Sequence, residues 1–399
     1  MHRLTPEKWI ILAGGFGLPD RTASATRAIG LAKLAEYSGY RVLILGKFVS
    51  APRTKYDQYE IVVNGVKARD IRRPFLDSSE CDYVVDGASV EDVAKYIGPE
   101  KVALVLLYNY PSRGLMSVMR RCAKINAPVA LDLTEWYGWE GAKIVRNIIR
   151  VVDTEFRMRV LSKYVGNVIC TSSFLARKIL SRNMMILPFV VDKDEWKWSQ
   201  AMSSAELDPE ARTFVYSGSP GLRMHKDLLP QIVQAFSLLP LDGCKFVLDI
   251  VGIDKETYLS EVPRHVITLQ LLGNRVRFHG RVSHETALRK LVNSHYSIFV
   301  RKPNRVSNSG FPTKYMEATT LGVPVISNIT SDIGNYLFHK RNGIVVEGFD
   351  SKSILKALKL AVEMDAGDYM RMREEQLSNN PFEKQNWIDL FRSFMGRLQ

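Results

Sequence analysis

Short apolar runs alternate with longer stretches of helical periodicity along almost the whole chain. Apolar runs of roughly four to eight residues are typical of buried strands, and apolar positions three and four apart are typical of helices that cover a sheet. The strands predicted in the first half are 9–13, 41–45, 102–107, 129–133 and 167–171. This alternation favours parallel sheets joined by right-handed helical crossovers, so the predicted fold class is α/β.

The alternation begins again after a polar stretch at residues 196–212, which contains Pro209 and several serines and lacks a core period. The strands predicted beyond it are 213–217, 245–251, 276–279, 296–300 and 324–327. We therefore predict an N-terminal domain over 1–195, a linker over 196–212 and a second domain over 213–380. Each would be doubly wound, and the two would face each other across a cleft that holds the active site.

The segment 381–399 has apolar residues at helical spacing, among them Trp387, Phe391 and Phe394. That spacing predicts an amphipathic helix. Its apolar stripe would pack back on one of the two domains.

Composition limits the classes of function. Of the 399 residues, 46% are hydrophobic and 24% charged, which is typical of a folded globular protein. The 55 basic and 42 acidic residues give a net charge of +13, which attracts phosphate-rich partners. The basic residues are dispersed and match no RNA- or DNA-binding motif, so we expect no nucleic-acid partner.

Cysteine usage and the lack of long apolar runs indicate a cytoplasmic location. The four cysteines lie far apart with no Cys-x-x-Cys pair, which argues against a zinc site and a disulfide framework. No window approaches the roughly 18 uninterrupted apolar residues of a membrane-spanning helix. We expect a cytoplasmic protein that is soluble or peripheral on the inner face of the membrane.

The first predicted strand leads into Gly14-Gly15-Phe16-Gly17, ahead of a helix predicted over 23–36. Backbone amides in such a loop can hold an anion or a sugar, so Gly15, Phe16 and Gly17 are candidates for acceptor binding, with a tight structural turn as the alternative. A dinucleotide-binding loop is excluded because its third glycine position is Asp20.

A second loop opens with Gly218 and delivers Arg223 and Lys226 to the start of a helix. Two cations at a helix N-terminus suit a diphosphate. The alternative is that Lys226 is a solvated residue of the first turn.

The densest group of charges follows the strand 296–300, where Arg301 and Lys302 lead into a loop that ends at Lys314 and Glu317. In an open α/β sheet the carboxyl ends of the strands face the ligand. Cations there would hold phosphates, and the one acid would accept hydrogen bonds from sugar hydroxyls. A solvated run of charges is the alternative.

Asp132 closes the predicted strand 129–133, and Glu135 follows next to Trp136 and Tyr137. The two acids suit the binding of acceptor hydroxyls, and either is a candidate catalytic base if the reaction inverts. The aromatic rings suit stacking on a sugar face. A helix N-cap role for Asp132 is the alternative.

Four cations share one face of a predicted helix: Lys143, Arg146, Arg150 and Arg157. Each cation near an anionic leaflet contributes roughly 1 kcal/mol, so such a face would dock reversibly on an anionic membrane. An ordinary solvated face is the alternative.

Several motifs resemble those of GT-B fold glycosyltransferases, in particular the retaining family 4 (group 1) type. The strongest lie in the second half: Tyr216-Ser217-Gly218, Lys226-Asp227, 276–282, Gly310 to Glu317, and 322–326. The resemblance implies two Rossmann-like domains, with a nucleotide-sugar donor in the second and an acceptor in the first. It also implies that the helix in 381–399 crosses back to the first domain.

The resemblance also implies residue roles. Glu317 matches the second acid of the family's paired-glutamate motif, which binds the donor ribose, whereas the first acid is replaced by Ser309. The Phe-Pro-Thr-Lys setting of Lys314 is similar to that in cell-surface polysaccharide glycosyltransferases and implies a phosphate contact. The expected reaction moves a sugar from a UDP- or GDP-sugar to a lipid-linked or polysaccharide acceptor, with retention. Ser309 leaves a non-catalytic GT-B-like subunit as the alternative.

We expect no cofactor and no metal, since the nucleotide-sugar is a substrate. Asp192-Lys193-Asp194 resembles a metal-binding triplet of another glycosyltransferase fold, but it lies at the predicted turn between domains. Side-chain cations near the donor suffice to balance its phosphate charge.

Overall fold

The computed structural model describes residues 8–18, 22–48, 60–63, 66–70, 87–138, 144–208, 210–221, 224, 226–240 and 245–398. The chain forms two compact units. The first comprises Met1–Asp192, Ser309–Phe311 and Phe382–Gln399, and the second comprises Lys193–Asn308 and Pro312–Pro381. The second unit is therefore inserted between parts of the first in the sequence.

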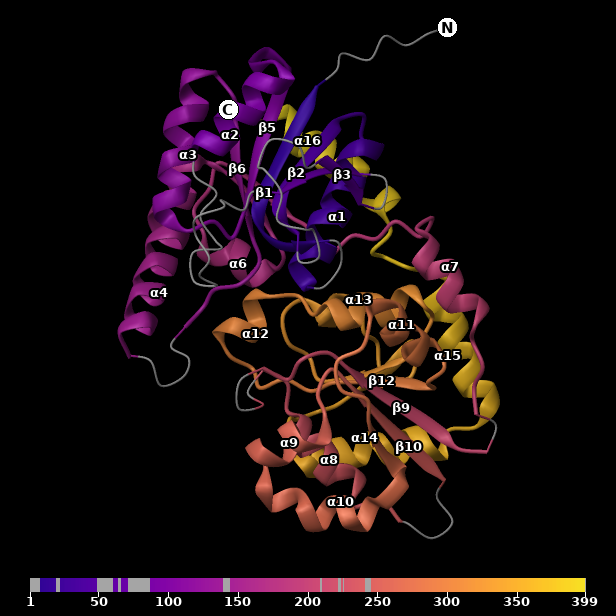
Figure 1. Cartoon of the computed structure of the whole chain (residues 1–399). Coiled ribbons are helices and arrows are strands. Elements are labelled where there is room, and N and C mark those ends of the chain that lie inside the picture. The colour runs from indigo at the N-terminus through magenta and orange to yellow at the C-terminus, as the bar shows by residue number, and fades with distance from the viewer. Residues whose placement is uncertain are drawn as a thin grey trace, which may run out of the picture. The chain divides into compact units, whose positions relative to one another are not determined.

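Within the described residues, the first unit has an eight-stranded sheet in the order β3-β4-β2-β1-β5-β6-β7-β8, parallel except for the pair β3–β4 (Figure 1). Its strands are β1 (Trp9–Leu18), β2 (Arg41–Phe48), β3 (Glu60–Val63), β4 (Val66–Asp70), β5 (Val102–Tyr108), β6 (Val129–Leu133), β7 (Asn167–Cys170) and β8 (Asn183–Ile186). Its helices are α1 (Ala23–Tyr37), α2 (Gly87–Ile97), α3 (Ser112–Lys124), α4 (Ile144–Phe156), α5 (Ser162–Val165), α6 (Ser173–Lys178) and α16 (Ile388–Gly396), with a π-helical turn at Arg157–Leu161.

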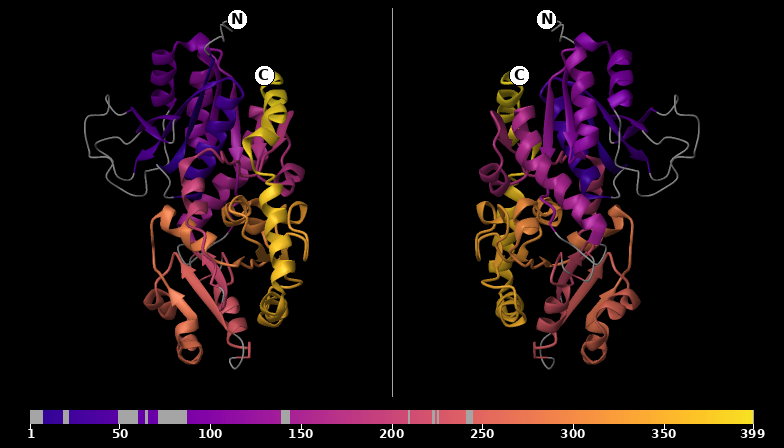
Figure 2. Two further views of the ribbon diagram at one scale, coloured as in Figure 1. Left: turned by 90° about the vertical axis from the view of Figure 1, so that its right-hand side faces the viewer. Right: turned by 90° about the vertical axis from the view of Figure 1, so that its left-hand side faces the viewer.

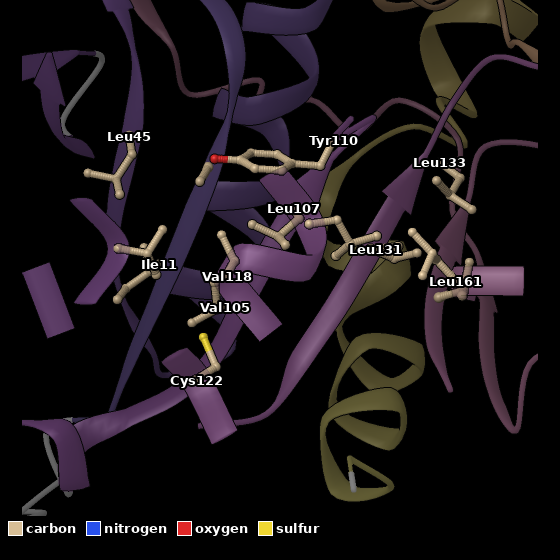
Figure 3. Packing of buried hydrophobic residues seen from close by; sticks show 14 of the residues in the cluster. Ile11, Leu45, Val105, Leu107, Tyr110, Val118, Cys122, Leu131, Leu133 and Leu161 are labelled. Atoms are coloured by element: carbon tan, nitrogen blue, oxygen red, sulfur yellow. The ribbon is translucent and has the colours of Figure 1, made fainter. Parts of the chain in front are cut away.

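Helices cover both faces of this sheet because successive side chains of a strand point to opposite sides. Ile10 and Leu12 of β1 belong to a core shared with α1 and α16. Ile11 and Ala13, one residue on, belong to a second core shared with α2 and α3. Figure 3 shows part of this second core, in which Ile11 lies near Val105 and Val118.

The last helix, α16, packs in the first unit against α1 and β8 (Figures 1 and 2). Two backbone bonds tie the segment before it to the chain after β8, since Val191 N–H donates to Phe382 O and Lys384 N–H donates to Val191 O. The side chain of Asn183 then donates to the carbonyl of Phe394 at 3.1 Å. The end of the chain is thus part of the first unit's core.

In the described part of the second unit, a six-stranded parallel sheet has the order β11-β10-β9-β12-β13-β14. Its strands are β9 (Arg212–Ser217), β10 (Phe246–Val251), β11 (Val276–Phe278), β12 (Tyr296–Ile298), β13 (Val325–Ser327) and β14 (Gly343–Val345). Its helices are α7 (Trp196–Ser203), α8 (Leu229–Phe236), α9 (Lys255–Glu261), α10 (Val266–Leu272), α11 (His284–Val292), α12 (Arg305–Ser309, whose last residue is in the first unit), α13 (Thr313–Thr320), α14 (Ser351–Glu363) and α15 (Ala366–Ser378).

The strand order of the second unit reverses at β9, because β10 lies on one side of it and β12 on the other. Ligands of doubly wound sheets bind beyond the carboxyl ends of the strands at such a switch point. The two units confirm the predicted α/β class with two doubly wound, Rossmann-like domains.

Two segments differ from the expectations. The stretch 196–212, expected to be a linker, begins with α7, which packs on α11 within the second unit. The expected loop at Gly14–Gly17 lies within β1, which continues to Leu18 after an irregularity in its pairing with β2. In both cases the burial of an apolar side chain explains the difference, since Trp198 of α7 and Phe16 of β1 are buried.

Helix α1 approaches the chain after β8 closely. Thr22 caps the helix by accepting from the N–H of Ala25 at 3.2 Å. Further along, a Cβ on Gly30 would lie 2.2 Å from the carbonyl oxygen of Val190. A glycine is needed at this position because the neighbour is backbone and cannot rotate away.

We predict that Gly30→Ala lowers the free energy of unfolding of the first unit by about 1–3 kcal/mol, despite alanine's better helix propensity. Thermal unfolding followed by circular dichroism measures the effect. The matched control is Gly396→Ala, where a Cβ meets nothing within 4 Å. Equal melting temperatures for the two variants would contradict the close approach.

Candidate active site

Glycines lie at the carboxyl ends of β9 and β10 in the second unit. Gly218, directly after β9, has a φ of 127°, and Gly252, after β10, has a φ of 110°. A Cβ on Gly252 would lie 2.5 Å from the Gly218 carbonyl oxygen, and one on Gly218 would lie 3.3 Å from Lys314 Nζ. The lack of side chains here lets the backbone and the lysine come together at the switch point.

A buried cluster of charges surrounds that lysine. Asp227 accepts hydrogen bonds from Lys314 Nζ at 2.5 Å and from the hydroxyl of Tyr216 at 2.8 Å. Arg301 Nε lies 3.4 Å from the other oxygen of the same carboxylate. The Lys314 ammonium also lies over the Tyr216 ring, 4.2 Å from its centroid. One carboxylate therefore holds two cations that both follow β12 and are far from Asp227 in the sequence.

The pKa directions follow from burial and from these contacts. Burial lowers the pKa of Lys314, and Asp227 opposes that change. Burial alone would raise the pKa of Asp227, but Lys314 and Arg301 outweigh it and the pKa is lowered. Burial and Asp227 together raise the pKa of Tyr216 well above its ordinary value, so the phenol stays protonated as a donor. Asp227 thus stabilises the charged form of Lys314.

Arg301 is the member of this cluster with unused hydrogen-bonding capacity. Its backbone is fixed by Asn328, which accepts from Arg301 N–H and donates to Arg301 O. The side chain is 5% exposed, and its Nε and Nη1 have no hydrogen-bond partner among the described residues. A buried guanidinium with unsatisfied N–H groups fits an anionic ligand such as a phosphate.

Glu317, one turn beyond Lys314 on α13, accepts a hydrogen bond from His284 Nε2 at 3.0 Å. The Glu317 side chain is 15% exposed. His284 opens α11, so the carboxylate is oriented by a neighbouring helix. Orientation of this kind suits an acid that accepts hydrogen bonds from ligand hydroxyls.

The other predicted donor residues are less constrained. Lys226 and Lys302 are exposed. Arg223 lies outside the described residues. A cavity of about 290 Å³ in the same unit is lined by a different set of residues: Pro230, Gln231, Gln234, Arg264, His265 and Ser351. No predicted donor residue lines it.

In the first unit, Asp132 is fully buried beside Arg27 of α1. Arg27 Nη2 and Nε donate to the two carboxylate oxygens at 2.8 and 3.1 Å. The same guanidinium donates to the carbonyl of Leu187 at 2.9 Å and to that of Pro188. The expectation that Asp132 could serve as a base is therefore corrected, because both of its oxygens are occupied away from solvent.

Glu135, by contrast, is partly exposed and accepts a hydrogen bond from the Tyr137 hydroxyl. Burial, with Glu135 nearby, raises the pKa of Tyr137. Trp136 is 3% exposed and its indole N–H donates to Glu155 at 2.9 Å. The expectation that Trp136 stacks on an acceptor is corrected, since its ring is buried.

Phe16 is also buried and packs against Tyr108, with ring centroids 5.2 Å apart. It belongs to the core, so its expected acceptor role is corrected. Gly15 and Gly17 beside it are partly exposed, and the Gly17 N–H donates to the hydroxyl of Thr22 at 3.4 Å. Only these two glycines of the expected acceptor loop remain open to a ligand.

Ser309, which replaces the expected first acid, has a structural role in the first unit, to which it belongs. Its hydroxyl accepts from the Trp136 backbone N–H at 2.9 Å. Its carbonyl accepts from the hydroxyls of Thr171 and Ser172 at 3.1 and 2.8 Å. The small side chain is therefore part of a hydrogen-bonded network.

Among the residues that the structure describes, no group of three or more histidine, cysteine, aspartate or glutamate side chains is placed to hold a metal ion. Asp192, from the triplet that resembles a metal site, is buried in an ion pair with Lys384. Its carboxylate is thus engaged in fixing the returning C-terminal segment.

Residues 205–379 match the family described as Glycosyl transferases group 1, and the chain is accordingly a glycosyltransferase. No curated protein sequence matches the chain.

Solved structures show the same fold over nearly the whole chain. Sucrose-phosphate synthase from Thermosynechococcus elongatus has 14% identity and a TM-score of 0.68, with 98% of each chain covered. Anabaena HepE, solved in complex with UDP and glucose, has 15% identity and a TM-score of 0.66, covering 98% of this chain and all of its own. A glycosyltransferase from Rickettsia africae has 13% identity and a TM-score of 0.65, with 98% of each covered. The fold is therefore GT-B.

Two residues of these sites were missed by sequence reasoning. Asp227 follows Lys226 directly, but it pairs with a lysine 87 positions away, which no local pattern reveals. The sequence did carry a usable signal for Arg27, because the charge of this residue lies between apolar residues of α1. A cation on a buried helix face requires a buried anion.

We predict that Asp132→Asn destabilises the first unit by about 3–5 kcal/mol, because it leaves Arg27 charged and uncompensated. Glu135→Gln, at a partly exposed site, should leave the melting temperature nearly unchanged. Thermal unfolding of both variants, with turnover of the folded fraction, separates stability from chemistry. A stable Asp132→Asn variant with a turnover loss of roughly 10²-fold or more would restore Asp132 as a base.

Proposed function

We propose that this glycosyltransferase uses a nucleotide-sugar donor, a UDP- or GDP-sugar, and transfers the sugar with retention to a lipid-linked or polysaccharide acceptor. The setting would be cell-surface polysaccharide or glycolipid synthesis at the cytoplasmic side of the membrane. The observation that carries the donor proposal is the cluster of Lys314 and Arg301 at the switch point of the second unit, held by buried Asp227.

The residues around the switch point have separate roles in this proposal. Arg301 and Lys314 bind the donor diphosphate, with Arg301 supplying the N–H groups that have no partner in the described structure. Glu317, oriented by His284, accepts hydrogen bonds from the ribose hydroxyls. Gly218 lets the diphosphate approach the backbone. Further cations that would contribute are Lys226, Lys302 and Arg223.

The same cations would stabilise the leaving group. In the transfer, the bond between the anomeric carbon and the diphosphate oxygen breaks, and the acceptor oxygen bonds to that carbon on the same face. The proton of the acceptor hydroxyl goes to the departing diphosphate. Negative charge grows on the diphosphate as the bond breaks, and preorganised cations in a site of low dielectric constant are most effective there.

The second candidate function is a non-catalytic subunit of a glycan-synthesis complex. It is favoured by Ser309, whose hydroxyl takes part in the network with Trp136 rather than supplying a carboxylate. Such a subunit would retain donor binding but not transfer. Hydrolysis or transfer measured with a bound donor therefore distinguishes the two functions.

We predict that UDP or GDP raises the melting temperature of the protein, while the matching nucleoside does so much less. A ligand at 100 times its dissociation constant adds about 2.7 kcal/mol. Lys314→Met should remove most of the diphosphate effect and little of the nucleoside effect. The control is Lys356→Met on α14, a lysine that is 74% exposed. Equal losses for diphosphate and nucleoside would mean that Lys314 does not contact phosphate.

We predict that Glu317→Gln weakens donor binding by roughly 1–3 kcal/mol, because the ribose hydroxyls lose a charged acceptor. Nucleoside and nucleoside diphosphate should be affected alike, unlike in Lys314→Met. Isothermal titration calorimetry with both ligands measures this. Unchanged nucleoside affinity in a folded variant would refute the ribose contact.

A further inference from the structure

A helical segment at the edge of the first unit has its polarity reversed. The chain is helical from Ile144 to Val165 through α4, the π-helical turn and α5 (Figure 1). Its buried side chains include polar ones: Asn147, Thr154, Arg157 and Ser162. Its exposed side chains are mostly aliphatic or aromatic. In an ordinary surface helix the apolar stripe faces the core instead.

Two inward-facing polar side chains of the segment bond to the rest of the unit. Arg157 Nη1 donates to the carbonyls of Asn109 and Tyr110 at 3.1 and 3.0 Å. Asp153 accepts from the Ser112 N–H at 2.8 Å. These contacts fix which side of the helix faces inward, so the opposite, apolar side is held outward.

The outward side forms a continuous apolar strip. Val145, Ile149, Val152 and Tyr164 are 71%, 64%, 62% and 74% exposed. Further large apolar side chains that are exposed in this segment are Ile148, Phe156 and Val160. Apart from the adjacent Ile148 and Ile149, successive members lie three or four positions apart, which places them along one helix face. We call these seven residues the α4 strip.

The charges around the α4 strip have one sign. In the described part of 145–165, the only exposed residues besides the strip are Arg159 and Lys163. The two acids of the segment are only partly exposed and have partners. Asp153 accepts from Ser112, and Glu155 accepts from Trp136 with one oxygen and from Arg159, at 2.7 Å, with the other. The surface is therefore apolar and cationic, without an exposed acid.

We propose that the α4 strip docks into the interfacial region of an anionic lipid bilayer, with the helix lying in the plane of the membrane. Apolar side chains enter the boundary between headgroups and acyl chains, and Lys163 pairs with anionic headgroups. A second copy of the chain would bring the same apolar and cationic residues and no acid to match the cations. No helix in the described residues is long and apolar enough to cross a membrane, which fits docking on the surface.

This surface differs from the basic face expected from the sequence. Arg157 is buried, and Arg150 is partly exposed and donates to the carbonyl of Gly138 at 3.1 Å. Lys143 and the side chain of Arg146 lie outside the described residues. The apolar strip replaces those cations as the main docking element.

Co-sedimentation of the full chain with vesicles tests the proposal. The vesicles are phosphatidylcholine alone, or phosphatidylcholine mixed with phosphatidylglycerol. Wild type should bind the vesicles that contain phosphatidylglycerol more tightly than those of phosphatidylcholine alone. Ile149→Ser/Val152→Ser should weaken that binding about tenfold or more, and Lys163→Glu should weaken it only at low salt. The matched control is Ile267→Ser/Leu271→Ser on α10, which removes side chains that are 77% and 56% exposed.

Three results would overturn the proposal: no binding of wild type to anionic vesicles, equal binding of the strip variant and wild type, or equal loss in the α10 control. Size-exclusion chromatography with light scattering tests a fourth result that would overturn it. If wild type were a dimer and the strip variant a monomer, the surface would be assigned to contact with a second copy of the chain. Stabilisation by UDP or GDP, measured on the same variants, should be unchanged. If UDP or GDP did not stabilise even wild type, the donor proposal would be contradicted instead. Failure of the membrane proposal and failure of the donor proposal are therefore distinguishable.

Discussion

The second unit depends on one buried carboxylate. Asp227 is 1% exposed and balances Arg301, from the loop after β12, and Lys314 of α13, while Tyr216 donates to it from β9. Two cations without this anion would repel each other in a medium that excludes water, and the loops that carry them would separate. The arrangement keeps the cations close together and charged before any ligand arrives, so little reorganisation is needed to bind an anion.

The first unit uses the same kind of interaction for a different purpose. Arg27 on α1 pairs with Asp132 at the end of β6 and also donates to the carbonyls after β8. Because the guanidinium is fully buried and all these acceptors are directional, the pair sets the position of α1 relative to the carboxyl end of the sheet. In the first unit the buried pair of Arg27 and Asp132 fixes the position of a helix. In the second unit the buried Asp227 leaves Arg301 with N–H groups that have no hydrogen-bond partner among the described residues.

The strands were predictable because both faces of a central parallel strand are buried, which produces continuous apolar runs such as 102–107. Lys314 and Glu317 were found through their motif, but Asp227 was not, since its partners are distant in sequence. The reversed polarity of α4 was also hidden. Periodicity places Arg157 on one face with other cations, but its hydrogen bond to the carbonyl of Asn109 turns Arg157 inward. Pairings between remote segments are therefore what sequence reasoning missed.

The return of α16 to the first unit has a consequence for biosynthesis. The second unit is encoded between parts of the first, so its residues leave the ribosome while the first unit still lacks α16, which packs against α1 and β8. The inserted unit can therefore fold before the unit that encloses it in the sequence. Until Phe391 and Phe394 arrive, the core beside α1 and β8 lacks two of its buried aromatic side chains and is prone to aggregation, so the period of greatest risk falls after the inserted unit has been synthesised.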